Sequence, residues 1–195
     1  MGAAQANSKA MLILSVAELS PEAAALLRAD AQPLEYLNLL VANQLYADAV
    51  RFLAHALPKR ECVWWAWVCA RRSAGEKPPP KIKSSLDATE KWIAQPNEEN
   101  RRMAKAAADA AGIASAAGCA GLAAFFSGGS LGPPEAPPVQ PGDYLTAKAV
   151  SGAVIFAAVS PAPEKAPDQF KSFIAQGVEV TQKIKLWEGK PEGRS

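Results

Sequence analysis

Residues 61–72 read ECVWWAWVCARR and hold three tryptophans within four positions, with charged side chains only at the two ends. The nine positions 62–70 are all apolar, a pattern typical of a helix buried on every side. Nine residues are too few to cross a bilayer, which takes about 20. Pro58 comes shortly before this run and suits the first turn of a helix. We therefore expect residues 58–72 to form the hydrophobic centre of the fold.

The three tryptophans of this stretch cannot form one flat stacking platform. At about 100° per helical residue, Trp64 and Trp67 lie about 60° apart, whereas Trp65 lies about 160° from Trp67. The main interpretation is a core helix. The alternative places one tryptophan, Trp65, at an interface with a partner protein, where tryptophan is an over-represented anchor.

His55, Cys62 and Cys69 recur at intervals of seven residues, which suggests neither a metal site nor a disulfide. Seven helical residues rise about 10.5 Å, whereas zinc ligands lie within about 2.3 Å of one ion. A disulfide needs Cα atoms within about 7 Å of each other. Cys119 could join only through tertiary folding. We predict no metal site, and we expect reduced, buried thiols, as in a cytoplasmic protein.

Outward from this stretch, helix signals recur along the chain. Ser20 and Pro21 are typical of a helix start, Asn97 predicts an N-cap, and Gly112 predicts a helix end. Thr146 is expected to cap a later helix. The expected helices cover about 20–28, 33–57 (one helix or two), 58–72, 85–95, 97–112, 113–126, 146–160 and 167–187.

These signals predict an all-α fold: a single compact multi-helix domain of about seven or eight helices, with two proline-rich loops. The loops are GEKPPPKIKS (75–84), expected to be extended, and GPPEAPPVQPGD (132–143). Residues 1–19 are expected to be a flexible leader or a short packing arm, with strand-like alternation only at 11–17. The helical domain is expected to span 20–187, followed by a disordered tail at 188–195.

The charge is nearly balanced overall but uneven along the chain. The net charge is +2, whereas residues 51–110 contain twelve basic and seven acidic side chains. This basic middle third supports an alternative function, the binding of nucleic acid or another anion. Base-stacking aromatic residues are not interleaved with these charges, which argues against it. The side chains of this basic face would be Arg71, Arg72, Lys77, Lys81, Lys83, Arg101 and Arg102.

Motifs of known catalytic sites are absent from the sequence. His55 is the only histidine, and it lies in the apolar stretch FLAHAL. The FFSGGSLGPP stretch (125–134) resembles an anion-binding turn, but a glycine that ends a helix explains it more simply. We therefore predict no catalytic residue and no cofactor, and an enzyme with a dispersed site remains a second alternative. No segment is long and apolar enough to suggest a membrane span.

Several blocks of the chain together resemble an uncharacterised bacterial family, a domain of unknown function. They are DAVRFLAHALPKRECVWWAWVCARR (48–72), QPNEENRRMAKAAADAAG (95–112), FFSGGSLGPP and LTAKAVSGAVIFAAV. The resemblance covers roughly residues 20–180 and carries no assigned activity. It implies an association with type VI secretion loci, and hence a cytoplasmic accessory protein.

The leading functional expectation is a non-enzymatic protein-binding adaptor or chaperone-like accessory, whose partner is a secretion component or an effector. The blocks include polar residues that are expected to cluster at the partner-binding surface together with Trp65. These are Arg60, Glu61, Arg71, Arg72, Asn97, Asn100, Arg101, Ser127 and Ser130. Finding them scattered over the folded surface would contradict this hypothesis. The sequence does not determine the oligomeric state.

Overall fold

A computed structural model describes residues 10–28, 30–160 and 162–187, and within these residues the only regular elements are helices, with no strand. They form ten α-helices rather than the seven or eight expected, counting the helical residues 10–16 as the first. The others are α2 (Pro21–Ala25), α3 (Pro33–Ala42), α4 (Tyr46–Ala56), α5 (Lys59–Ser73), α6 (Pro80–Ala94), α7 (Glu98–Ala111), α8 (Ala116–Phe125), α9 (Leu145–Val159) and α10 (Ala166–Lys183), with a short 3-10 helix, η1 (Pro163–Lys165), before α10.

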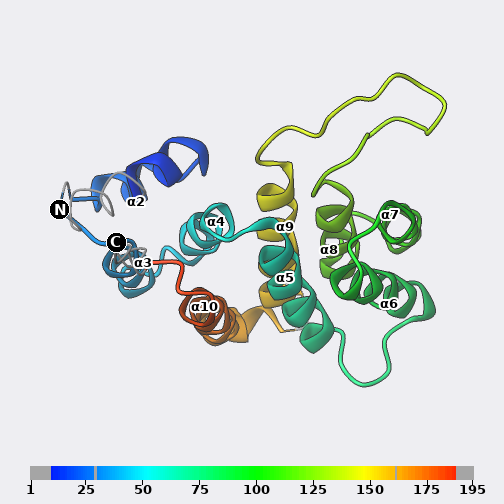
Figure 1. Cartoon of the computed structure of the whole chain (residues 1–195). Helices are drawn as coiled ribbons and strands as arrows, with labels where there is room; N and C mark the ends of the chain where they lie inside the picture. Colours follow the sequence, from blue (N-terminus) through cyan, green and yellow to red (C-terminus); the bar gives the residue numbers. More distant parts are fainter. Residues whose placement is uncertain (1–9, 29, 161, 188–195) are drawn as a thin grey trace.

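The helices pack on both sides of a central pair, α5 and α9 (Figure 1). On one side, α8 contacts both central helices, and α6 and α7 complete that half of the molecule. On the other side, α4 and α10 contact α9, and α3 packs on α4. The segment between α8 and α9 extends away from the helices (Figure 1). The tryptophan helix α5 is therefore central, as its sequence predicts.

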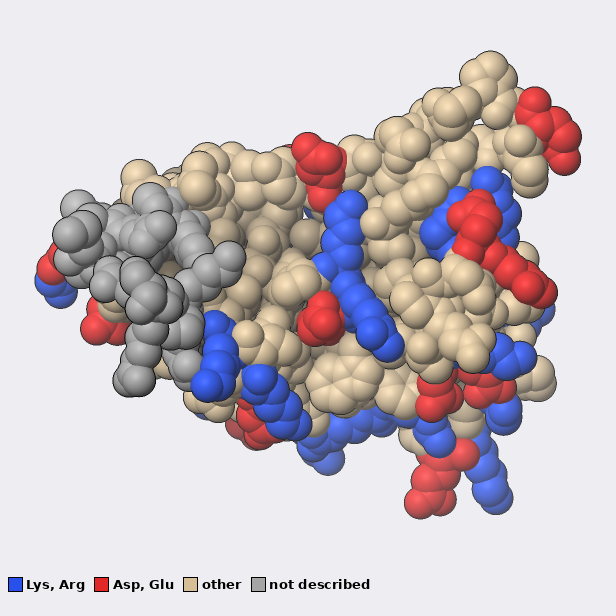
Figure 2. All heavy atoms as spheres, in the orientation of Figure 1, with Lys and Arg blue, Asp and Glu red and all other residues tan. Residues whose placement is uncertain are grey.

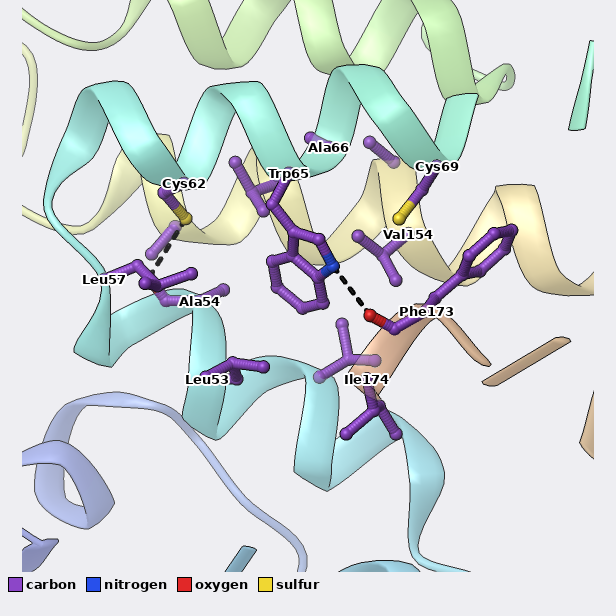
Figure 3. Packing of buried hydrophobic residues seen from close by; sticks show 14 of the residues in the cluster. Leu53, Ala54, Leu57, Cys62, Trp65, Ala66, Cys69, Val154, Phe173 and Ile174 are labelled. Atoms are coloured by element: carbon purple, nitrogen blue, oxygen red, sulfur yellow. Dashed lines mark hydrogen bonds between the residues drawn. The ribbon is translucent and has the colours of Figure 1, made fainter. Parts of the chain in front are cut away.

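Trp65 lies at the centre of the core with no exposed surface. Its indole Nε1 donates a hydrogen bond of 2.8 Å to the backbone oxygen of Phe173 in α10, so its polar atom is satisfied (Figure 3). Gly177 lets α10 approach, because an added Cβ would lie 2.5 Å from Leu53 and 2.8 Å from the Trp65 ring. The three cysteines are free and buried, and burial raises the pKa of the Cys62 and Cys69 thiols.

Most predicted helix ends are confirmed. They could be predicted because each depends on groups within one turn of the helix. The Ser20 side chain accepts a hydrogen bond from the backbone N–H of Ala23, and Asn97 accepts one from Asn100. Gly112 ends α7 with φ at 85°, in the left-handed region that glycine tolerates. Gln44, at φ 60°, separates α3 from α4, so residues 33–57 form two helices.

Three local expectations are wrong. Residues 10–16 form a helix rather than an extended segment, and the burial of Ala10, Ile13 and Ala17 in the core agrees with the other alternative, a short packing arm. The stretch 75–84 is not extended throughout, because α6 begins at Pro80, where the fixed φ of proline suits a first turn. Thr146 does not cap α9, which begins at Leu145 and buries Thr146 in its first turn. The expected leader up to residue 9 and the tail 188–195 lie outside the described residues.

Candidate functional site

One face of α5 is exposed, although the helix is central. Trp64 has 37% of its surface exposed, whereas Trp65 has none. The expectation that Trp65 lies at a partner interface is therefore corrected: packing against α9 and α10 turns Trp65 inward and leaves Trp64 outside. We call the outward row Arg60, Trp64, Val68 and Arg71 the α5 stripe. These positions recur at helical spacing within about 80° of arc, so they lie on one side of the helix.

A shallow depression of about 380 Å³ adjoins the C-terminal end of the α5 stripe. Its apolar lining comes from Trp67 and Val68, and Arg71 and Arg72 supply two guanidinium groups. Gly75 and Glu76, from the connection after α5, complete the lining. The stripe and depression together give an apolar strip with arginines at both ends.

The arginines of α5 are bound only to neutral groups. Arg60 Nε donates to the Ile93 carbonyl at 2.9 Å, and an Arg71 guanidinium nitrogen donates to the Gly75 carbonyl at 3.0 Å. Arg72 donates to the Ser172 hydroxyl at 2.8 Å. Within the described residues, none of these three forms an ion pair, whereas the other four described arginines all do: Arg28, Arg51, Arg101 and Arg102. Neither Glu61 nor Glu76 pairs with them.

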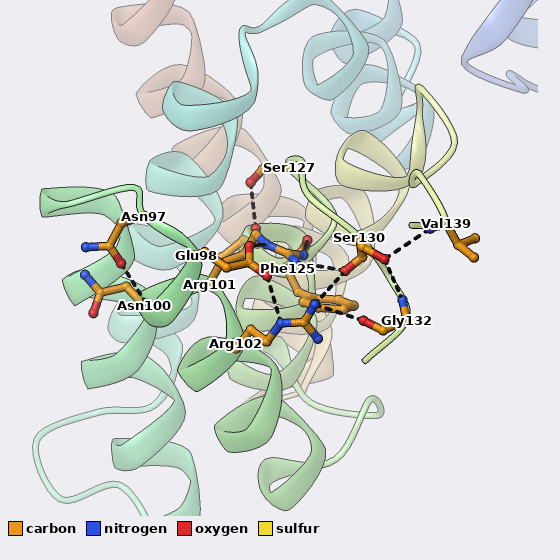
Figure 4. Close-up of polar contacts among 11 residues, drawn as sticks. Asn97, Glu98, Asn100, Arg101, Arg102, Phe125, Ser127, Ser130, Gly132 and Val139 are labelled. Atoms are coloured by element: carbon orange, nitrogen blue, oxygen red, sulfur yellow. Dashed lines mark hydrogen bonds and ion pairs between the residues drawn. The ribbon is translucent and has the colours of Figure 1, made fainter. Parts of the chain in front are cut away.

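A second group, the Arg101 cluster, joins the start of α7 to the end of α8. It consists of Glu98, Arg101, Arg102, Phe125 and Ser130 (Figure 4). Arg101 is only 3% exposed and binds the Glu98 carboxylate through two nitrogens, at 2.6 and 2.8 Å. It also donates to the backbone oxygens of Phe125 and Ser130, at 2.7 and 2.9 Å. Its guanidinium carbon lies 4.5 Å from the centre of the Phe125 ring.

The Arg101 cluster closes the base of the long α8–α9 connection. Ser130 Oγ accepts hydrogen bonds from the backbone N–H groups of Gly132 and Val139, each at 3.1 Å. Arg102 donates to the Gly132 carbonyl at 2.9 Å and to Glu98 at 2.8 Å. The Arg101 and Arg102 guanidinium groups hold the pKa of Glu98 down, to about 2. Because these groups satisfy one another, the arrangement is structural.

The polar residues expected to cluster lie in several separate places. Arg101, Ser127 and Ser130 lie around the end of α8, where Ser127 Oγ donates to the Ala124 carbonyl at 2.7 Å. Asn97 caps α7, and Asn100 donates to the Gln95 carbonyl at 2.9 Å. Arg60 and Glu61 lie at the start of α5, near the end of α6, whereas Arg71 and Arg72 lie at the other end of α5. Eleven helical residues separate Arg60 from Arg71, about 16 Å along the axis. These residues therefore do not form the single cluster that was expected from the sequence.

The proposed basic face is partly neutralised within the molecule. Arg101 and Arg102 are bound to Glu98, and Lys83 is bound to Asp87 at 2.6 Å. On the face shown in Figure 2, basic and acidic side chains are interspersed rather than gathered into one continuous basic area.

A small pocket that sequence reasoning missed lies beside His55. It measures about 190 Å³ and lies where the end of α4 meets the first turns of α5 and α9. Burial lowers the pKa of His55, and the nearby Lys148 lowers it further, whereas the hydrogen bond to the Arg51 carbonyl raises it. No pattern in the sequence could have paired His55 with Thr146, because only the packing of α4 against α9 brings them to one pocket.

Metal and membrane signals are weak in the described part of the chain. No group of three or more histidine, cysteine, aspartate or glutamate side chains is placed to hold a metal ion there. Within the same residues, no single helix has both the length and the apolarity to cross a bilayer. The α9 and η1–α10 segments meet that test only when taken together, and they are bent by 108°.

Comparison with known proteins identifies a family but no activity. No curated protein and no solved structure matches the chain significantly. The resemblance found in the sequence is confirmed for its family, whose model matches residues 36–181 and so includes both the α5 stripe and the Arg101 cluster. The chain belongs to DUF6931, a family of unknown function.

Proposed function

We propose that this protein is a non-enzymatic adaptor that binds an acidic, apolar segment of another protein along the α5 stripe. The observation that carries this proposal is the set of three α5 arginines without an acidic partner among the described residues, at the two ends of the exposed Trp64 and the half-buried Val68.

The composition of the stripe supports a protein partner. Tryptophan and arginine are the residues that most often dominate the energy of protein interfaces. Trp64 supplies a large apolar surface, and Arg71 and Arg72 provide planar donors that bind carboxylates in a bidentate manner. The adjoining depression is wide and shallow, which suits a side chain of a docked segment better than an enclosed small molecule.

The charge of the stripe favours an acidic partner segment. The four ion-paired arginines have satisfied their charge inside the molecule, whereas Arg60, Arg71 and Arg72 retain guanidinium nitrogens for a partner. Carboxylates spaced about 16 Å apart would reach both ends of the stripe, a span of about five residues of extended chain. An apolar residue between them would contact Trp64.

The remaining details come from the resemblance noted in the sequence. Such a docking surface is compatible with a bacterial, cytoplasmic, chaperone-like accessory protein that acts on a type VI secretion component or effector. The alternatives have less support. Nucleic-acid binding needs a continuous basic surface, whereas the charges seen in Figure 2 are mixed. The cysteine thiols have raised pKa values, which disfavours a nucleophilic role.

The test joins cross-linking to a direct binding measurement. The full-length protein, carrying a photo-crosslinker at Val68, is expressed in its native cell, and the cross-linked segment of the partner is identified by mass spectrometry. The corresponding peptide is then titrated by calorimetry. We expect Trp64→Ala to weaken binding at least tenfold, because the anchor contact is lost, and Arg71→Gln with Arg72→Gln to weaken it and reduce its salt dependence.

Two control variants test whether the loss of binding is specific to the α5 stripe. Ile113→Ala removes an exposed apolar residue elsewhere, at 67% exposure, and Lys83→Gln removes a charge already paired with Asp87. Both should leave binding unchanged. The proposal is wrong if the peptide binds the Trp64 and arginine variants as tightly as the unaltered protein, or if only nucleic acid is cross-linked.

A further inference from the structure

The connection between α8 and α9 contains a proline-rich stretch, PPVQP (137–141), which we call the proline segment. The connection extends away from the helices (Figure 1), and Pro137 and Pro138 are exposed. Val139, an apolar residue, has 56% of its surface exposed and lies outside the hydrophobic core. The need to fill a core therefore does not explain the composition of this segment.

The residue types of the proline segment restrict its backbone to the polyproline II conformation. Proline fixes φ at about −65°, and a residue that precedes a proline is confined to extended or polyproline II geometry. All residues of the segment except Val139 are prolines or precede one. In the structure, residues 137–142 accordingly form no helix, strand or turn. Such a segment loses little conformational entropy when it binds to a partner.

The free hydrogen-bonding groups of the proline segment are mostly acceptors. Its prolines have no N–H, and the Val139 N–H already donates to Ser130 Oγ at 3.1 Å (Figure 4). The Pro137 and Pro138 carbonyls accept no hydrogen bond from the described residues. A strand that joins a partner's sheet needs both donors and acceptors, so this segment is unsuited to that role. A groove that supplies donors to carbonyls matches it.

The Arg101 cluster fixes the position of the proline segment at its base. Arg101 donates to the Ser130 carbonyl at 2.9 Å, and the Leu131 N–H donates to the Val139 carbonyl at 2.8 Å. These bonds join the outgoing and returning parts of the connection, while Pro137 and Pro138 beyond them stay exposed. The segment is ordered when the protein folds, so a partner orders less of it on binding.

The side chains in and around the proline segment determine the chemistry of the partner. A polyproline II helix has three residues per turn, so Pro138 and the half-buried Pro141 lie on one edge. Proline-rich segments of this kind dock in grooves lined by aromatic side chains. Glu135 and Asp143 flank the segment, and both are exposed with no ion pair among the described residues. The complementary surface is therefore an aromatic groove with basic side chains beside it.

We propose that the proline segment docks as a polyproline II ligand in an aromatic-lined groove of another protein. Basic side chains next to that groove pair with Glu135 and Asp143. This surface lies on the α8–α9 connection and is distinct from the α5 stripe. The proposal goes beyond the docking of an acidic segment along α5 and does not depend on it.

The first part of the test finds what the proline segment contacts. A photo-crosslinking amino acid replaces Gln140 in the full-length protein, which is expressed in its native cell. The cross-linked residues of the partner are identified by mass spectrometry. We expect them to lie beside tryptophan or tyrosine side chains of one protein. The same crosslinker at Glu90, an exposed position of α6, is the control and should not label that groove.

The second part of the test measures binding of the purified partner to variants of the full-length protein by calorimetry. Pro138→Ala should weaken binding at least tenfold without changing the melting temperature, because the residue is exposed. Pro134→Ala is the matched control, since it removes an exposed proline from the turn at 133–136, outside the segment, and should leave binding unchanged. Glu135→Gln should weaken binding and reduce its salt dependence.

Three results would overturn the proposal. The first is cross-linking from position 140 that is no more frequent than from position 90. The second is cross-linking to a surface without aromatic side chains, or to a second copy of this chain. The third is a Pro138→Ala variant that binds the partner as tightly as Pro134→Ala does.

Discussion

The Arg101 cluster and the His55 pocket both bring buried polar groups to helix ends, but they differ in hydrogen bonding. In the Arg101 cluster, each guanidinium nitrogen of Arg101 has a partner within the chain. On two residues that line the His55 pocket, the His55 Nε2 and Thr146 Oγ1 atoms have no partner within the described residues. A buried polar group that lacks a partner costs about 1–3 kcal/mol, so unpaired groups persist only where something compensates for them.

This difference assigns different roles to the two regions. The Arg101 cluster holds the long α8–α9 connection to α7, and its hydrogen bonds contribute to the free energy of unfolding. The His55 Nε2 and Thr146 Oγ1 atoms form no hydrogen bond with the described residues, so they contribute none to the stability of the fold. Substitutions in the Arg101 cluster should therefore lower the free energy of unfolding, whereas removal of the unpaired groups at the His55 pocket should leave it nearly unchanged.

The largest effect is expected for Arg101→Met. The substitution keeps much of the side-chain volume but removes the charged donor of the Phe125 carbonyl and leaves the Ser130 carbonyl with only the longer bond from Arg102, at 3.3 Å. Allowing for the exposed Glu98, we expect the free energy of unfolding to fall by about 3 kcal/mol in urea denaturation. Arg102→Met, at a more exposed position, should cost about 1 kcal/mol or less. Equal losses in the two variants would contradict the structural role of Arg101.

The next effect concerns the turn that Arg101 covers. Gly129 has φ at 65°, and an added Cβ would lie 2.7–2.8 Å from the Arg101 guanidinium. Gly129→Ala should therefore reduce the free energy of unfolding by about 2 kcal/mol, from backbone strain and displacement of Arg101. At Gly128 a Cβ would meet nothing within 4 Å, so Gly128→Ala is the matched control and should be nearly neutral. A neutral Gly129→Ala would show that the turn is not held as described.

Acid should weaken the Arg101 cluster through Glu98. Its pKa is lowered from 4.5 to about 2, first by the hydrogen bond from Arg101. A carboxyl with a lowered pKa contributes stability that is present above pH 4.5 and is lost as the pH falls towards 2. Because the side chain is 56% exposed, screening limits the contribution to about 1 kcal/mol. Urea denaturation over this pH range should show the loss, and Glu98→Gln should lack this component.

The smallest effect on stability is expected at Thr146, where a buried hydroxyl lacks a hydrogen-bond partner. Thr146→Val removes an unpaired buried hydroxyl, so the free energy of unfolding should stay unchanged or rise by about 1 kcal/mol. Thr181→Val removes a paired hydroxyl and should lose about 1 kcal/mol. Thermal and urea denaturation of the two variants give the sign directly. A clear loss in Thr146→Val would mean that its hydroxyl has a structural partner.

Local chemistry made much of the fold predictable. The Ser20 and Asn97 caps and the Gly112 helix end follow from groups within one turn, so they could be read from the sequence. The expected cap at Thr146 failed, because burial against neighbouring helices places that residue inside the first turn of α9. The unbroken run of nine apolar residues also indicated that the tryptophan helix is central. It did not indicate that one face, at Trp64, stays exposed.

The candidate sites depended on packing instead. A helical pattern determines the angle between Trp64 and Trp65 but not which of them faces inward, and contact with α10 decided that Trp65 is buried. The spacing of Trp64 with Arg60 and Arg71 was a signal that could have identified the exposed stripe. No comparable signal exists for Arg101 and its partners in α8 and the following loop.

The sequence by itself determined an all-helical chain, the ends of most helices and the apolar character of α5. These features depend on interactions between residues within a turn or two of each other. Only the tertiary structure decided that Arg101 is enclosed by carbonyls, that Trp64 is exposed, and that His55 and Thr146 line one pocket. These residues lie far from their neighbours in sequence and come together only because helices pack against one another. The side chains between two packed helices set the distance and angle between them.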